Sequence, residues 1–305
     1  MLIIDAHAHL WDELRGDIFG KQVSNRENGR VMFGDRLKQM MPPYMVDGKN
    51  TAEMLLSNME YSGVGAAVIT QEYIDGLQNN YLESTKKKFG NKFIVMGMAE
   101  FRESDFYSEV ESLIKKGFNG IKVPAEKLIS EDSRVYLNSK EMLKIFKLME
   151  ENNVILSIDL AEGEVQVEEM KDVIEKCPDL KVAIGHFGMV NRPGWRSQIE
   201  LAKNKNVYIE SGGITWLFHG EFYPYKGAVE AIKEAAEIAS EDKLMWGSDY
   251  PRTMTEITYK MSYDFILKSS ELSDTFKRKF LGETAKKFYE IEELEAASVV
   301  ESILG

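Results

Sequence analysis

Two histidines stand close together near the start of the chain. The segment His7-Ala8-His9 follows the apolar residues 2–4. In a β-strand, residues two apart project from the same face, so a strand here would present both imidazoles together. A pair of same-facing imidazoles is typical of half of a metal site, although histidines that only bond to neighbouring backbone fit the same pattern. The rest of the chain has to distinguish these two interpretations.

Other polar residues also end or interrupt short apolar runs. The chain has four histidines, and a third, His186, follows such a run, as do Asp159 and Asp249, while Lys122 lies within one. Two imidazoles and a carboxylate can bind a divalent cation such as zinc and leave a position for water. The cation lowers the pKa of that water towards about 7, and a further histidine or aspartate can move a proton. These residue types therefore predict metal-assisted chemistry on a small-molecule substrate.

The elements that would position these residues alternate regularly. Eight apolar runs of strand type are each followed by a helix, or by a loop and a helix. The runs cover residues 2–9, 66–70, 93–98, 120–123, 154–159, 180–184, 207–210 and 243–246. Such an alternation predicts an α/β protein with a parallel sheet covered by helices, and eight strands predict a closed (β/α)8 TIM barrel. An open doubly wound sheet is the alternative, but no glycine-rich fingerprint follows the first strand.

Two segments lie outside this alternation. Residues 11–50 are rich in glycine and too long for an ordinary connection, so we expect a functional loop or lid after the first strand. Residues from about 254 to 303 predict additional C-terminal helices that pack on the outside or the end of the barrel. With the barrel at about residues 1–253 and no visible linker, we expect residues 1–305 to form a single domain.

In a barrel of this kind, the loops after the strands form the mouth that carries the chemistry. The histidines at positions 7, 9 and 186 fall at expected C-terminal strand ends, as do Asp159 and Asp249. The fold would therefore bring them together.

Three motifs together resemble the amidohydrolase superfamily. They are His7-Ala8-His9 after the first strand, Gly185-His186-Phe187-Gly188 after the sixth and Trp246-Gly247-Ser248-Asp249-Tyr250-Pro251 after the eighth. The chain is most similar to the amidohydrolase-2 branch, which holds amidohydrolase-related hydrolases, lactonases and decarboxylases. The resemblance implies that His7 and His9 are metal ligands and that Asp249 is a ligand or the base that activates water. It implies that His186 is a further ligand or a proton-transfer residue.

One position departs from the metal-dependent pattern of that branch. Its members usually carry a histidine ligand at the end of strand five, where this chain has Asp159. Asp159 is a candidate oxygen ligand, and a metal-free lactonase is an alternative. Lys122 lies on the strand where binuclear members carry a carboxylated, metal-bridging lysine, but we expect it to contact a substrate anion or to reach solvent.

Three further residues are candidates for substrate binding. Trp11 directly follows the histidine pair and is expected in the wall of the pocket. His219 lies in an aromatic-rich loop after strand seven and either lines the pocket or is an exposed loop residue. Arg252 either pairs with a substrate carboxylate or forms a surface salt bridge.

The composition limits the class of partner. The net charge of −12 and the lack of an extended basic cluster argue against a nucleic-acid partner. No signal peptide and no apolar run long enough to span a membrane are visible, so we expect a cytoplasmic protein. A homo-oligomer is compatible with the sequence, although no interface pattern is visible.

Together these observations favour a hydrolase in which water attacks a lactone, ester or amide carbonyl. One divalent metal, zinc or alternatively manganese, is the expected cofactor. Non-oxidative decarboxylation of an aromatic or muconate-type acid is a rival that uses the same motifs. A barrel that binds ligands without catalysis is a rival of a different class, but it predicts loss of the mouth residues, which are all present.

Overall fold

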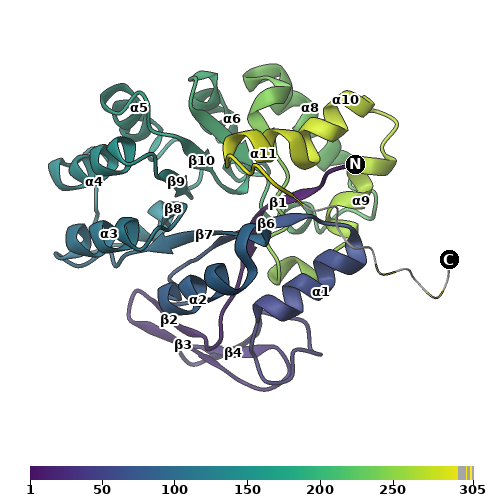
Figure 1. The fold of residues 1–305 in the computed structure, drawn as a ribbon, viewed down its shortest axis with the longest axis horizontal. Coiled ribbons are helices and arrows are strands. Elements are labelled where there is room, and N and C mark those ends of the chain that lie inside the picture. Colours follow the sequence, from purple (N-terminus) through teal and green to yellow (C-terminus); the bar gives the residue numbers. More distant parts are fainter. Residues whose placement is uncertain (295–299, 301–302, 304–305) are drawn as a thin grey trace.

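The computed structural model describes residues 1–294, 300 and 303, and shows eight parallel strands in a nearly closed barrel (Figure 1). The strands lie in chain order around the barrel. They are β1 (Ile4–His9), β6 (Ala66–Thr70), β7 (Phe93–Met98), β8 (Gly120–Val123), β9 (Ile155–Ile158), β10 (Val182–Ile184), β11 (Val207–Glu210) and β12 (Leu244–Met245). Backbone bonds between the two ends of this sheet, such as His9 N to the Tyr250 carbonyl at 2.8 Å, close the ring. The (β/α)8 barrel prediction is confirmed.

Helices cover the outside of the strands (Figure 1). They are α1 (Ala52–Ser62), α2 (Asn79–Phe89), α3 (Phe106–Lys115), α4 (Lys140–Glu151), α5 (Val167–Lys176), α6 (Trp195–Glu200) and α8 (Lys226–Ala239), while the short α7 (Ile214–Leu217) lies at the barrel mouth. Two of these helices begin at N-capping residues. The hydroxyls of Thr51 and Ser139 accept hydrogen bonds from backbone N–H groups in the first turns of α1 and α4. The apolar faces of these helices pack on the outward-facing strand residues.

The segment after β1 is long, as expected, but it is not irregular. It folds as a four-stranded antiparallel sheet of β2 (Arg15–Ile18), β3 (Lys21–Asn25), β4 (Arg30–Phe33) and β5 (Arg36–Gln39). The sequence predicted a functional loop or lid here but not the sheet that the segment forms. These strands are short and largely polar, and all of β5 is exposed, so the alternating pattern that marks a half-buried strand is weak.

Three C-terminal helices follow the barrel, and the last of them packs on the end where the strands begin. They are α9 (Met261–Lys268), α10 (Asp274–Arg278) and α11 (Thr284–Phe288), with a π-helical turn between the last two. Ala285, Phe288 and Ile291 pack against the inward-facing Ile4 and Ala66, so this end of the barrel interior is apolar and covered. The helix expected to continue towards residue 303 is not present at 291–294, and most of the rest lies outside the described residues.

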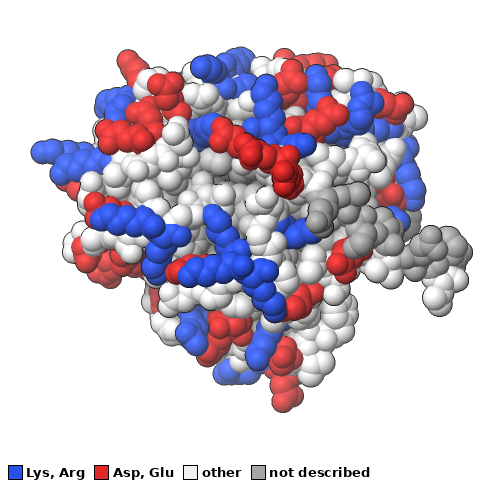
Figure 2. Space-filling view, in the orientation of Figure 1, with Lys and Arg blue, Asp and Glu red and all other residues white. Residues whose placement is uncertain are grey.

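The outer surface is mixed in charge. On the face drawn in Figure 2, Lys and Arg side chains are interspersed with Asp and Glu. No helix among the described residues is long and apolar enough to cross a membrane.

Candidate active site

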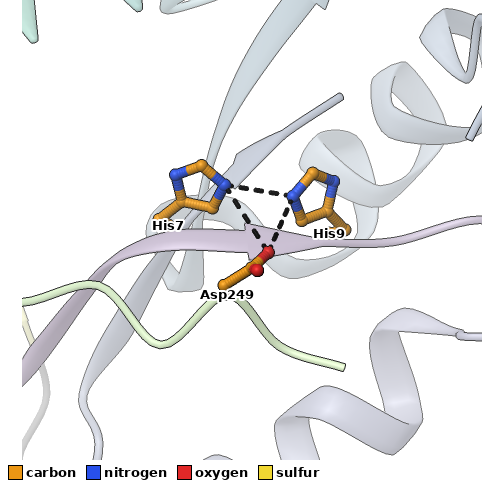
Figure 3. Close-up of side chains that lie close together, drawn as sticks. All are labelled: His7, His9 and Asp249. Carbon is orange, nitrogen blue, oxygen red and sulfur yellow. Dashed lines mark hydrogen bonds and ion pairs between the residues drawn. The ribbon is translucent and has the colours of Figure 1, made fainter. Parts of the chain in front are cut away.

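The predicted histidines and Asp249 meet at the open end of the barrel. His7 and His9 project from β1, and Asp249 comes from the segment after β12 (Figure 3). The two Nε2 atoms are 3.0 Å apart, and Oδ1 of Asp249 lies 3.8 Å from Nε2 of His7 and 3.3 Å from Nε2 of His9. All three side chains are buried.

A bulge in β1 places the histidines. Asp5 pairs with Ala67 and Ala8 with Ile69, so β1 has one residue more than β6 between these pairs. Such a bulge redirects the side chains that follow it. It allows His7 and His9 to face the barrel interior although Ile4 and Ala6, on the earlier part of the strand, also face inward.

Two buried carboxylates set the tautomers of the histidines. Nδ1 of His7 is 2.7 Å from Glu210, and Nδ1 of His9 is 2.6 Å from Asp75. Both carboxylates also accept from other N–H groups: Glu210 from the backbone of Gly212, and Asp75 from the Arg252 guanidinium. Because these carboxylates are acceptors, each Nδ1 must donate, and in the neutral rings each Nε2 carries a lone pair.

The arrangement of lone pairs fits a cation. Two Nε2 lone pairs and Oδ1 of Asp249, which accepts no hydrogen bond within the described residues, face one another in a buried space. Such a group needs either a shared proton or a metal ion to balance its mutual repulsion. Two imidazoles with carboxylate partners and one further carboxylate are a donor set that suits zinc.

His186 joins this group from the 3₁₀ turn after β10. Its Nδ1 donates to the Gly212 carbonyl at 2.8 Å, which leaves Nε2 to face Asp159 at 3.6 Å. Nε2 can therefore serve as a further ligand or carry a proton. Burial lowers the pKa of His186, but nearby carboxylates, Asp159 first, outweigh it and raise the pKa to about 10.

The backbone at two of the candidate residues is strained. His186 and Asp249 adopt φ values of 55° and 56°, in the left-handed region that side chains other than glycine rarely adopt. Strain of this kind persists only when surrounding contacts hold it, and it is concentrated at functional sites. Here Asp249 is held by its backbone bond to the His7 carbonyl at 2.8 Å and by Trp216, whose Nε1 donates to Oδ2 at 2.7 Å.

Two glycines allow the close packing of this site. A Cβ at Gly247 would lie 2.7 Å from Cβ of His7, and a Cβ at Gly185 would lie 2.0 Å from Oδ1 of Asp159. Neither position can carry a side chain without displacing these groups.

Lys122 and Asp159 form a buried ion pair. Nζ of Lys122 lies 2.6 Å from Oδ2 of Asp159, and the lysine is fully buried. Burial opposes ionisation of both groups, but the paired charges hold the pKa of Asp159 well below its usual range and raise that of Lys122. Lys122 therefore neither reaches solvent nor lines the cavity described next.

A cavity of about 500 Å³ opens above these residues. Its lining includes Asp159, His186, His219, Asp249 and Arg252 of the predicted site, while His7 and His9 lie beneath it. Trp11 is not brought to the cavity. It is buried in the core of the four-stranded sheet, where its Nε1 donates to the Gly48 carbonyl at 2.9 Å.

Two residues of this site, Glu210 and Asp75, were not predicted from the sequence. Glu210 is the last residue of β11. Other acidic residues became candidates because they end a predicted strand, and the same criterion applies to Glu210. Asp75 lies in the loop after β6, and no local pattern marks it.

Comparison with known proteins agrees with this architecture. The family model described as Amidohydrolase matches residues 4–291. No curated protein matches the chain.

Solved structures share the fold at low sequence identity. A putative 2-pyrone-4,6-dicarboxylic acid hydrolase from Pseudomonas putida is 18% identical with a TM-score of 0.70, over 96% of this chain and 98% of its own. An amidohydrolase from Burkholderia multivorans with bound zinc is 16% identical with a TM-score of 0.69, over 95% and 99%. A 2,6-dihydroxybenzoate decarboxylase from Rhizobium is 12% identical with a TM-score of 0.62, over 80% and 90%.

Proposed function

The chain belongs to the amidohydrolase family, a family of enzymes, and on that premise we propose that it is a metal-dependent hydrolase of a lactone, ester or amide. The observation that carries the proposal is the group of facing lone pairs on His7, His9 and Asp249, each histidine being fixed by a carboxylate at Nδ1. His7, His9 and Asp249 would hold one divalent cation, with His186 or Asp159 completing its ligands. When bound, the cation polarises a carbonyl and lowers the pKa of water.

The protein's own residues supply orientation and proton transfer. Burial opposes ionisation of Asp249, but the nearby histidines and Arg252 hold its pKa well below its usual range, so it is ionised and can bind the cation and accept a hydrogen bond from the attacking water. Where Asp159 rather than His186 completes the ligands, His186 lines the cavity with a raised pKa and carries a proton that it can donate to the leaving group. Trp216 fixes the carboxylate plane of Asp249.

The proposed metal is zinc, with manganese as the alternative. Zinc suits a site with two imidazoles and a carboxylate, and the zinc found in the Burkholderia amidohydrolase supports this choice. We further propose that the protein acts in the cytoplasm, on a small molecule, without nucleic-acid or membrane partners. A homo-oligomer is compatible with this function.

Metal analysis by mass spectrometry beside hydrolysis assays tests the proposal. Wild-type protein should hold about one equivalent of a divalent ion and hydrolyse members of a panel of lactones, esters and amides. The His7→Ala/His9→Ala variant should lose both the metal and the activity. His219→Ala is the matched control for metal content, because His219 lines the cavity but its side chain bonds only to the Trp216 carbonyl.

Two outcomes would contradict the proposal. Hydrolysis by protein that takes up no metal even after supplementation would favour a metal-independent lactonase. Release of CO₂ from aromatic acids, without hydrolysis of the panel, would favour a decarboxylase.

A further inference from the structure

The two cations expected to meet a substrate anion are already paired with protein carboxylates. The Arg252 guanidinium lies 2.9 Å from Asp75 and 3.3 Å from Glu72. Lys122 pairs with Asp159 at 2.6 Å and does not line the cavity. Neither cation has its charge available for a carboxylate on the substrate.

A further lysine at the cavity, Lys127, leaves no positive charge in excess either. Its Nζ is 3.4 Å from Oε1 of Glu126. Burial, and then the charges of Glu72 and Asp159, raise the pKa of Glu126 to about 8, so Glu126 is largely uncharged at pH 7. Burial opposes ionisation of Glu72, but Arg252 and Lys127 lower its pKa to about 2. The charges on this side of the cavity therefore balance, and an ionised Glu126 would only add a negative charge.

The remaining positive charges belong to the reacting end of the cavity. Nε2 of His186 lies 3.6 Å from Asp159, and the proposed metal ion would lie beside the histidines of β1 and Asp249. Both charges act on the reacting carbonyl. Among the described residues no cation is left for a carboxylate elsewhere on the substrate, and such a group would lose its hydration without a partner.

One side of the cavity is apolar. Leu160, Met189 and Trp216 line it, and they follow the neighbouring strands β9, β10 and β11. Side chains that follow neighbouring strands meet on one side of a barrel mouth, and we call these three residues the apolar wall.

The apolar wall begins at the reacting end. Nε1 of Trp216 donates to Asp249 at 2.7 Å, and the centroids of the Trp216 and His186 rings are 5.9 Å apart. A substrate whose carbonyl lies between Asp249 and His186 therefore places its neighbouring group against this wall.

We propose that the substrate carries an uncharged, apolar group near its reacting carbonyl, and that this group binds against Leu160, Met189 and Trp216. The inference rests on the proposed function for the reaction, but the choice of group is a property of the wall alone. It places the substrate among lactones, esters or amides with an alkyl or aryl substituent and no carboxylate. Such a substituent gains free energy on leaving water, whereas a carboxylate would give up its hydration.

Methyl ketones test the inference by binding alone, because they keep a carbonyl and are not hydrolysed. Butanone, benzylacetone and levulinate share one skeleton and carry hydrogen, phenyl and carboxylate at the same carbon. Titration calorimetry with the purified, metal-containing protein should show benzylacetone binding at least about tenfold more tightly than either of the others.

Variants assign this preference to the apolar wall. Met189→Asn removes apolar surface, and asparagine is tolerated at the left-handed φ of 57° found there. The variant should lower the preference for benzylacetone over butanone several-fold, whereas Met189→Leu should keep most of it. Thr255→Asn is the control, because Thr255 lines the same cavity outside the apolar wall, and it should leave the preference intact.

Three outcomes would overturn the inference. The first is binding of levulinate as tight as that of benzylacetone, which would show that a cation is available. The second is equal binding of benzylacetone and butanone. The third is an equal loss of preference in Thr255→Asn and Met189→Asn, which would place the phenyl group away from the apolar wall. A preference for benzylacetone without hydrolysis of any lactone, ester or amide would support the inference while contradicting the proposed function.

Discussion

The two halves of the barrel mouth use buried charge differently. On the β1 and β12 side, His7, His9 and Asp249 turn lone pairs towards one another, and the carboxylates that fix the histidines stand behind them. On the β8 and β9 side, Lys122 and Asp159 neutralise each other within the wall. The first half has lone pairs that a bound cation would balance, whereas the second contains its own cation. Asp159 at the end of β9 thus lies beside a lysine that balances its charge.

The largest effect should come from breaking the ion pair on the β8 and β9 side. Lys122→Met leaves Asp159 buried without its partner and should lower the free energy of unfolding by about 3–5 kcal/mol. Urea unfolding measures this. Lys122→Met/Asp159→Leu should recover most of the loss, because no charge remains buried.

An exposed pair provides the control. Lys147 bonds to Glu150 on the surface of α4, and Lys147→Met should cost less than about 1 kcal/mol. If Lys122→Met cost no more than this, Lys122 would not be needed to balance the charge of Asp159 in the folded state.

The carboxylates behind the histidines should affect metal affinity rather than the fold. Glu210→Gln removes the charged acceptor of His7 Nδ1 and should weaken metal binding about 10- to 100-fold, measured by competition with a chelator. Glu221→Gln is the control, since Glu221 also accepts from a backbone N–H, that of Gly227, but does not contact the histidines. If Glu210→Gln left the metal affinity unchanged, Glu210 would not be needed to orient His7 as a metal ligand.

The indole that holds Asp249 should have a smaller effect. Trp216→Phe removes the hydrogen bond to Oδ2 and should lower kcat about tenfold, because the carboxylate is charged and water from the cavity replaces only part of the bond. Metal content should stay at the wild-type value. Trp195→Phe, at the start of α6, should change kcat less than twofold; an equal loss there would point to a general effect on packing.

The last prediction concerns the pH dependence of stability in metal-free protein. The pKa of His186 is raised from 6.5 to about 10, so its protonation stabilises the folded state. This contribution is complete below pH 6.5 and is lost as the pH rises towards about 10, at no more than about 1.4 kcal/mol per pH unit.

His186→Gln should therefore differ from the wild type most at pH 6 and least near pH 10, by urea unfolding in the presence of a chelator. The pKa of His7, by contrast, is lowered because burial outweighs its pairing with Glu210. If the difference in unfolding free energy between His186→Gln and the wild type does not change with pH, His186 carries no proton in the metal-free fold.

The sequence alone predicted much of the barrel and part of the mouth. The apolar runs located the strands because a parallel strand is buried on both faces, and β6, β7, β8 and β11 begin and end at the expected residues. The expectation that the chemistry lies at the C-terminal ends of the strands located His7, His9, His186 and Asp249. The apolar runs did not locate β2 to β5, because these strands are short and largely polar. The apolar residues that they bury, such as Val23 and Val31, are too few to show an alternating pattern.

What the sequence by itself determined is that two imidazoles share one face of the first strand and that a carboxylate ends the last one. Only the tertiary structure decided what those groups can do. Glu210 meets His7 across 203 residues of chain because closing the barrel brings β11 beside the ends of β1 and β12. That contact fixes which nitrogen of His7 carries the lone pair. The contact between Lys122 and Asp159 neutralises the charge of Lys122, which the sequence predicted to meet a substrate anion. Both are long-range contacts, whose energies depend on distance and burial rather than on local pattern.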